Sequence, residues 1–115
     1  MAYDEYLADR IRTILMEKHV AFNEKKMMGG LCFMVDDKMC MGVEKNKLMA
    51  RIDPDIYDKA LMKKGAMEMT FTGRTMKGFV FVEQEGIDMD NDLDYWVQLC
   101  LDFNPKAKSS KKNKK

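Results

Sequence analysis

The chain has 115 residues, of which 46% are hydrophobic and 34% charged, with a formal net charge of +1. This length fits one domain with one hydrophobic core, and no apolar run approaches the roughly 20 residues of a membrane-spanning helix. The first residues lack a secretory signal and the three cysteines include no CxxC pair, so we expect a cytoplasmic protein with reduced thiols and no membrane contact.

The first predicted element is an amphipathic helix from about Asp4 to His19. Apolar residues recur there at helical spacing, and Asp4 is placed to act as the N-cap. The segment Ala21–Lys26 is polar and is predicted to be a connection. It leads to Gly29 and Gly30, where glycine permits a bulge or a close backbone approach.

Residues 31–35 and 39–43 predict a hairpin around the loop Asp36-Asp37-Lys38. A loop with an odd number of residues places the odd-numbered apolar residues of both strands on one face of the sheet. The same register places Cys32, Met34 and Cys40 together on the opposite face. A third strand is expected at about 47–52.

Asp53-Pro54 predicts the start of a second helix, with Gly65 just beyond its end. Strands at about 67–71 and 79–83 flank the turn from Gly73 to Gly78, and a last helix runs from about residue 90 to Pro105. The predicted order is α-β-β-β-α-β-β-α, an α+β domain over residues 1–104. We expect two layers, with an antiparallel sheet covered by helices on one face.

Residues 105–115 are predicted to be a disordered, lysine-rich tail. Its six lysines are part of 20 basic residues, so removing them leaves 14 basic against 19 acidic, a net charge of −5. Flexible positive charges attract phosphate backbones without recognising base sequence. The candidate nucleic-acid contacts are Lys106, Lys108, Lys111, Lys112, Lys114 and Lys115. The alternative is that the tail only increases solubility.

Residues that could carry chemistry are few. His19 is the only histidine and lies at the predicted end of the first helix, where it favours a capping role over catalysis. Cys32, Met34 and Cys40 form a soft set suited to monovalent copper if they share a face, although such residues more often fill an apolar interior. We therefore predict no catalytic residue, cofactor or metal.

The turn from Gly73 to Gly78 contains Arg74 and Lys77 but leads into a strand, so it does not fit a phosphate-binding loop. The two cations either face a phosphate or an acidic partner, or are solvated turn residues.

Three segments carry a resemblance to a known family: Lys25–Phe33, Phe71–Val82 and Leu93–Leu101. Together they resemble the N-terminal domain of the TfoX/Sxy family of bacterial competence regulators. The resemblance implies a two-layer, secretion-chaperone-like fold without known catalytic residues. Full-length members have a second, helical domain and are thought to act with the cyclic-AMP receptor protein at promoters, whereas in this chain we expect the lysine tail to take its place.

The resemblance also identifies family-motif positions as candidate partner contacts. They are Lys26, Gly29, Gly30, Gly73, Arg74, Lys77 and Gly78. We expect a non-enzymatic regulatory or interaction module that binds a protein partner related to transcription, as a monomer or homodimer. The alternatives are a nucleic-acid accessory protein acting through the basic tail, and a small enzyme or metal protein that uses Cys32 and Cys40.

Overall fold

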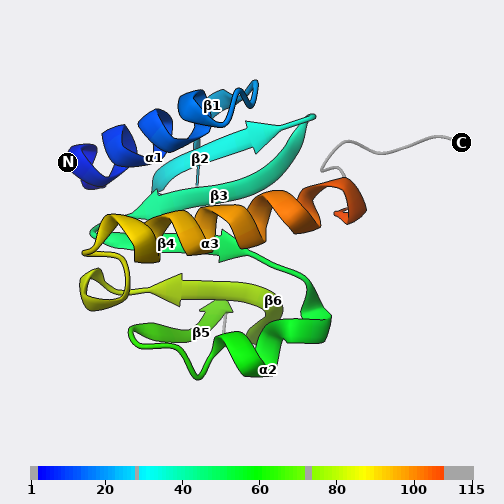
Figure 1. The fold of residues 1–115 in the computed structure, drawn as a ribbon. Coiled ribbons are helices and arrows are strands. Elements are labelled where there is room, and N and C mark those ends of the chain that lie inside the picture. The colour runs from blue at the N-terminus through cyan, green and yellow to red at the C-terminus, as the bar shows by residue number, and fades with distance from the viewer. Residues whose placement is uncertain (1–2, 28, 72–73, 108–115) are drawn as a thin grey trace, which may run out of the picture.

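The structure is a computed structural model that describes residues 3–27, 29–71 and 74–107. Over these residues the chain forms a six-stranded antiparallel sheet with the strand order β1-β2-β3-β4-β6-β5, accompanied by three α-helices (Figure 1). The strands are β1 (Asn23–Met27), β2 (Gly30–Val35), β3 (Lys38–Glu44), β4 (Lys47–Arg51), β5 (Ala66–Phe71) and β6 (Arg74–Val82). The helices are α1 (Glu5–Glu17), α2 (Tyr57–Ala60) and α3 (Asp90–Phe103). The predicted α+β class is confirmed.

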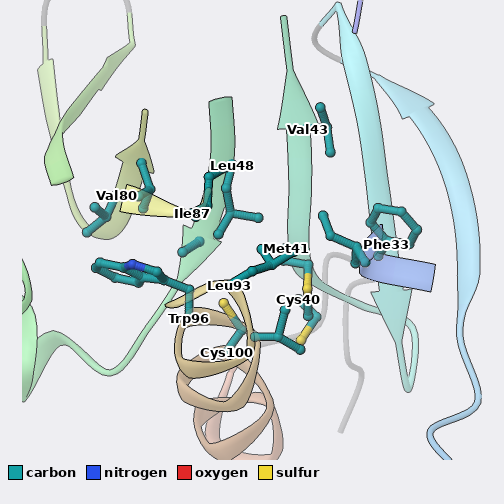
Figure 2. Close-up of a cluster of buried hydrophobic side chains, with 14 of the residues drawn as sticks. Phe33, Cys40, Met41, Val43, Leu48, Val80, Ile87, Leu93, Trp96 and Cys100 are labelled. Atoms are coloured by element: carbon teal, nitrogen blue, oxygen red, sulfur yellow. The ribbon is translucent and has the colours of Figure 1, made fainter. Parts of the chain in front are cut away.

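The helices cover one face of the sheet, as predicted. Figure 2 shows Leu93, Trp96 and Cys100 of α3 directed toward the strands, where they meet residues such as Met41 and Leu48. Trp96 is 1% exposed, so the large ring is fully inside this core. No helix of the described residues is long and apolar enough to cross a membrane.

Helix α1 begins as its sequence predicts. The Asp4 carboxylate accepts hydrogen bonds from the backbone N–H groups of Tyr6 and Leu7 at 2.9 and 3.3 Å. These bonds satisfy two of the amides that have no partner within a helix at its N-terminus. Leu7, Ile11 and Leu15 then place one buried stripe against the sheet.

The prediction of a connection over Ala21–Lys26 is wrong, because this segment contains strand β1. It pairs antiparallel with β2 along its whole length, with Glu24 opposite Phe33 and Lys25 opposite Cys32. Residues Asn23–Lys26 are exposed, so the apolar alternation that normally indicates a strand is missing. The pairing with β2 makes this segment a strand, and its lysines are typical of a sheet edge.

The predicted three-residue loop between β2 and β3 is also wrong. Val35 pairs with Lys38 across a two-residue turn, in which Asp36 and Asp37 have φ of 56° and 64°. This turn matches the right-handed strand twist, and aspartate tolerates positive φ. The register shifts again between Phe33 and Met34, which leaves Cys40 as an additional residue on β3.

This bulge changes which sulfur-containing residues share a face. Cys40 packs into the core beneath the helices, whereas Met39 joins Cys32 and Met34 on the opposite face. The expected grouping of Cys32, Met34 and Cys40 is therefore wrong.

The second helix is shorter than predicted. Asp53 caps a short 3-10 turn, Pro54–Ile56, by accepting a hydrogen bond from the Asp55 N–H at 2.9 Å, and α2 follows with only Tyr57–Ala60. Gly65 has φ of 81° and packs so closely on Gly86 that a Cβ at Gly65 would lie 2.8 Å from the Gly86 nitrogen. The Gly65 carbonyl also accepts a hydrogen bond from the Glu83 N–H at 2.8 Å. This bond holds the start of β5 beside the end of β6.

The described fold continues beyond the expected domain end at residue 104. The buried Asn104 amide donates to the Val35 carbonyl at 3.1 Å, and Ala107 is 8% exposed. Pro105, Lys106 and Ala107 therefore belong to the folded part of the chain. The rest of the predicted tail, residues 108–115, lies outside the described residues.

Candidate functional site

The structure does not gather the family-motif positions into one site. Lys26, Gly29 and Gly30 belong to β1, β2 and the turn between them, at one edge of the sheet. Gly78 lies on β6, and strands β3 and β4 separate β2 from β6. Gly73 lies outside the described residues, as do the side chains of Arg74 and Lys77.

Two of the motif glycines meet backbone requirements of the sheet. A Cβ at Gly30 would lie 2.2 Å from the Val43 carbonyl oxygen, so only glycine allows β2 and β3 to approach this closely. Gly78 has φ of 95°, and its carbonyl accepts the Ile52 N–H at 2.8 Å. Gly29, with φ of 76°, has nothing within 4 Å of a Cβ and lies in an open turn.

The three cysteines are buried, and their thiols are poorly reactive. Burial raises the pKa of Cys40 to about 12, an effect that the nearby Arg51 charge partly offsets. Burial likewise raises the pKa of Cys32 and of Cys100. Because the thiolate is the reactive form, all three thiols remain protonated near neutral pH.

The single histidine closes α1. The His19 backbone N–H donates to the Met16 carbonyl at 3.1 Å, with His19 at φ of 60°. No group of three or more His, Cys, Asp or Glu residues that could hold a metal exists in the part of the chain that the structure describes.

A groove runs between α1 and the first turns of α3. Its volume is about 420 Å³. The residues that line it are Tyr6, Arg10, Thr13, Ile14, Glu17, Asp90, Asn91 and Asp94. Tyr6 is 73% exposed, so most of its side chain is open to solvent. The sequence contained a signal for this surface, because Tyr6, Arg10, Thr13 and Glu17 recur at helical spacing.

Ion pairs connect the two helices across the groove. Arg10 donates to the Asp90 carboxylate at 3.1 Å and to the Asp88 carbonyl at 3.2 Å. Lys18 approaches the Asp94 carboxylate at 3.1 Å. Helices α1 and α3 together nevertheless carry seven carboxylates and only two arginines, so these two helices have a net negative charge.

The opposite face of the sheet carries a second apolar cluster. It comprises Cys32, Met34, Met39, Met49 and Met69, with Phe79 and Phe81 packed against them. We call this surface the helix-free face, because no described helix contributes to its cluster. Gly42 lies at its centre, where a Cβ would be 2.8 Å from the Met49 methyl group. The alternating Phe79-Val80-Phe81-Val82 sequence signals this second face, because every residue of the run is apolar.

Two cations lie over the aromatic rings of this face. Lys47 Nζ is 5.7 Å from the centroid of the Phe81 ring, and the Arg51 guanidinium carbon is 5.4 Å from that of Phe79. These distances are typical of cation–π contacts. Arg51 also donates to the Met39 carbonyl at 3.3 Å, which fixes the position of its side chain.

Of the predicted nucleic-acid contacts in the tail, the structure describes only Lys106. It is exposed and its ammonium lies 3.6 Å from the Asp53 carboxylate. Lys108, Lys111, Lys112, Lys114 and Lys115 lie outside the described residues.

Comparison with known proteins agrees with this architecture of three helices on one side of an antiparallel sheet. The family profile of the TfoX N-terminal domain matches residues 15–104, which is most of the chain. The chain belongs to the TfoX N-terminal domain family. No curated protein and no solved structure matches it.

Membership associates this TfoX N-terminal domain with competence regulation. The matched region begins near the end of α1 and ends just after α3, so it includes all six strands and the α3 wall of the groove, but only Glu17 of the α1 wall. No enzyme family was found for the chain.

Proposed function

We propose that this TfoX N-terminal domain is a non-enzymatic regulatory module that binds a basic segment of a protein partner in the groove between α1 and α3. The association of the family with competence regulation favours a partner that acts in transcription. The observation that carries the proposal is the combination of an exposed Tyr6 with three carboxylates in one groove.

The chemistry of the groove suits an extended or helical basic peptide. Tyr6 and Ile14 offer apolar contact, and exposed aromatic residues are frequent anchors of protein interfaces. Glu17 and Asp94 offer carboxylates to lysine or arginine. Because the Lys18–Asp94 pair is partly exposed, exchanging Lys18 for a cation of the partner costs little free energy.

A photo-crosslinking amino acid at Thr13 tests this proposal in cells. Thr13 is exposed and lines the groove, whereas exposed Lys59 on α2 provides a matched control position outside it. We expect one protein to be captured from Thr13 and not from Lys59. Adding Tyr6→Ala or Asp94→Lys should reduce its yield at least severalfold, because each removes one recognition element.

Two results would overturn the proposal. One is equal capture from Thr13 and Lys59, which would indicate random encounters. The other is a specific adduct that is insensitive to both Tyr6→Ala and Asp94→Lys, provided that each variant unfolds at the temperature of the parent.

A further inference from the structure

We propose that the helix-free face binds single-stranded nucleic acid, with Phe79 and Phe81 stacking on two bases while Lys25 and Lys47 contact the phosphates. This goes beyond protein binding in the α1–α3 groove and uses the other side of the sheet. It also differs from attraction of phosphates by the lysine tail, because it requires bases.

The register places all four side chains on one face. Phe81 lies opposite Met49 and Phe79 opposite Arg51, and directly opposed residues of an antiparallel pair share a face. In the same way Lys25 shares the face of Cys32, its partner in β2. Lys47 reaches this face as well, because its ammonium lies over the Phe81 ring.

The spacing of the rings fits two unstacked bases. Phe79 and Phe81 are two residues apart on β6, which corresponds to about 6.8 Å along a strand. Each ring is only partly buried, and a base that stacks on it takes the place of the cation over that ring, Lys47 for Phe81 and Arg51 for Phe79. Aromatic residues on a sheet commonly stack with splayed bases of a single strand, whereas the bases of a duplex are already stacked on one another.

The floor beneath the rings supports this use. Met49 is 1% exposed and Met69 3%, so the rings rest on a packed layer. Met67, opposite Phe81 in β5, is 39% exposed and extends the apolar surface at its edge. Methionine is flexible and polarizable, which allows adjustment to different bases.

The helix-free face and the helices differ in charge. Among the described strand residues that share it, Lys25, Lys47 and Arg51 are cationic and Glu44, opposite Lys47, is the anionic one. The carboxylates of α1 and α3 outnumber their arginines seven to two on the other side. A polyanion is therefore attracted to the helix-free face and repelled by α1 and α3.

Fluorescence anisotropy of the full chain with labelled 12-nucleotide probes tests the proposal. The probes are oligothymidylate, an abasic strand of the same length and charge, and a duplex. We expect the chain to bind oligothymidylate more tightly than the other two. Phe81→Leu should weaken that binding by about fivefold to a hundredfold, the range of one lost base–aromatic contact, and leave abasic binding unchanged.

The lysines and the tail give separate readouts. Lys25→Gln and Lys47→Gln should each lower the slope of log K against log salt by about 0.7 for a single strand, whereas the exposed control Lys59→Gln should not. Replacing the five lysines of residues 108–115 with serine should weaken the binding of all three probes to the same extent.

Several outcomes would overturn the proposal. One is equal affinity for the abasic and base-bearing strands, and another is a Phe81→Leu protein that keeps its melting temperature and its affinity. Binding of an acidic, phenylalanine-containing peptide, but not of oligothymidylate, at a site sensitive to Phe81→Leu would assign the face to a protein. Sedimentation showing a dimer that Phe81→Leu dissociates would assign it to a second copy. Failure of the photo-crosslinking experiment at Thr13 would contradict the proposed function of the α1–α3 groove, but it would not change any of these conclusions about the helix-free face.

Discussion

The orientation of Cys40 is determined by a bulge in the sheet. It is the extra residue of the bulge opposite Phe33 and Met34, and it turns into the core beneath the helices instead of sharing the face of Cys32. The alternating sequence around it favoured the other face. A bulge has no reliable signal in a single sequence, because it depends on how the paired strand and the turn fit together.

The buried Cys40 thiol predicts a loss of stability at alkaline pH. Burial raises its pKa to about 12, whereas a thiol in the unfolded chain titrates near about 8.5. Between these values the unfolded chain releases a proton that the folded chain retains. The free energy of unfolding should therefore be fully present below about pH 8.5 and fall by up to about 1.4 kcal/mol per pH unit above it.

Urea unfolding of the parent and of Cys40→Ala between pH 8 and 11 measures this contribution. The alanine variant should be less stable at pH 8 but lose stability more slowly as the pH rises. Cys100, whose pKa burial also raises, keeps part of the slope in both proteins. Parallel pH profiles for the two proteins would contradict the assignment.

At the scale of elements, the helices were more predictable than the strand pairing. Asp4 and Asp53 are capping residues with a local sequence signature, and both caps are present. Strand β1 could not be found in this way, because residues Asn23–Lys26 are polar and exposed. Its identity depends on pairing with β2 and on a contact from α1, and neither leaves an apolar alternation in residues Asn23–Lys26.

That contact predicts how the edge strand is held. Arg12 on α1 donates to both carboxylate oxygens of Glu24 on β1, from Nε at 2.5 Å and from Nη2 at 2.9 Å. The two side chains are 27% and 31% exposed. Glu24→Gln should therefore destabilise the fold by about 1 kcal/mol and speed hydrogen exchange in β1.

Asp90→Asn provides the control for this pair. The Arg10–Asp90 ion pair also joins distant elements, but its carboxylate is 98% exposed, so we expect no measurable change in stability. Equal effects of the two substitutions in chemical denaturation would show that the bidentate pair does not fix β1.

For the whole molecule, composition and periodicity predicted the α+β class and the helix-covered face, but not the second apolar face. Met39 was expected on the face of Leu31 and Phe33, and instead it packs with Cys32, Met34 and Met49 on the side that no described helix covers. The partner contacts expected at the family-motif positions stay a prediction. The motif positions Gly30 and Gly78 have backbone roles, whereas the groove and the helix-free face combine residues that only the sheet brings together.

The existence of two packed faces predicts that neighbouring residues of β4 contribute comparably to stability. Leu48 is 0% exposed on the helix side and Met49 is 1% exposed on the helix-free face. Each substitution to alanine removes buried methylene groups and leaves a cavity, so each should cost about 2–5 kcal/mol. Met62→Ala, at a side chain that is 85% exposed, should stay within about 0.5 kcal/mol of the parent. Urea unfolding followed by the fluorescence of buried Trp96 measures all three. If Met49→Ala behaved like Met62→Ala, the helix-free face would be a loose surface that could not hold Phe79 and Phe81 in place for stacking.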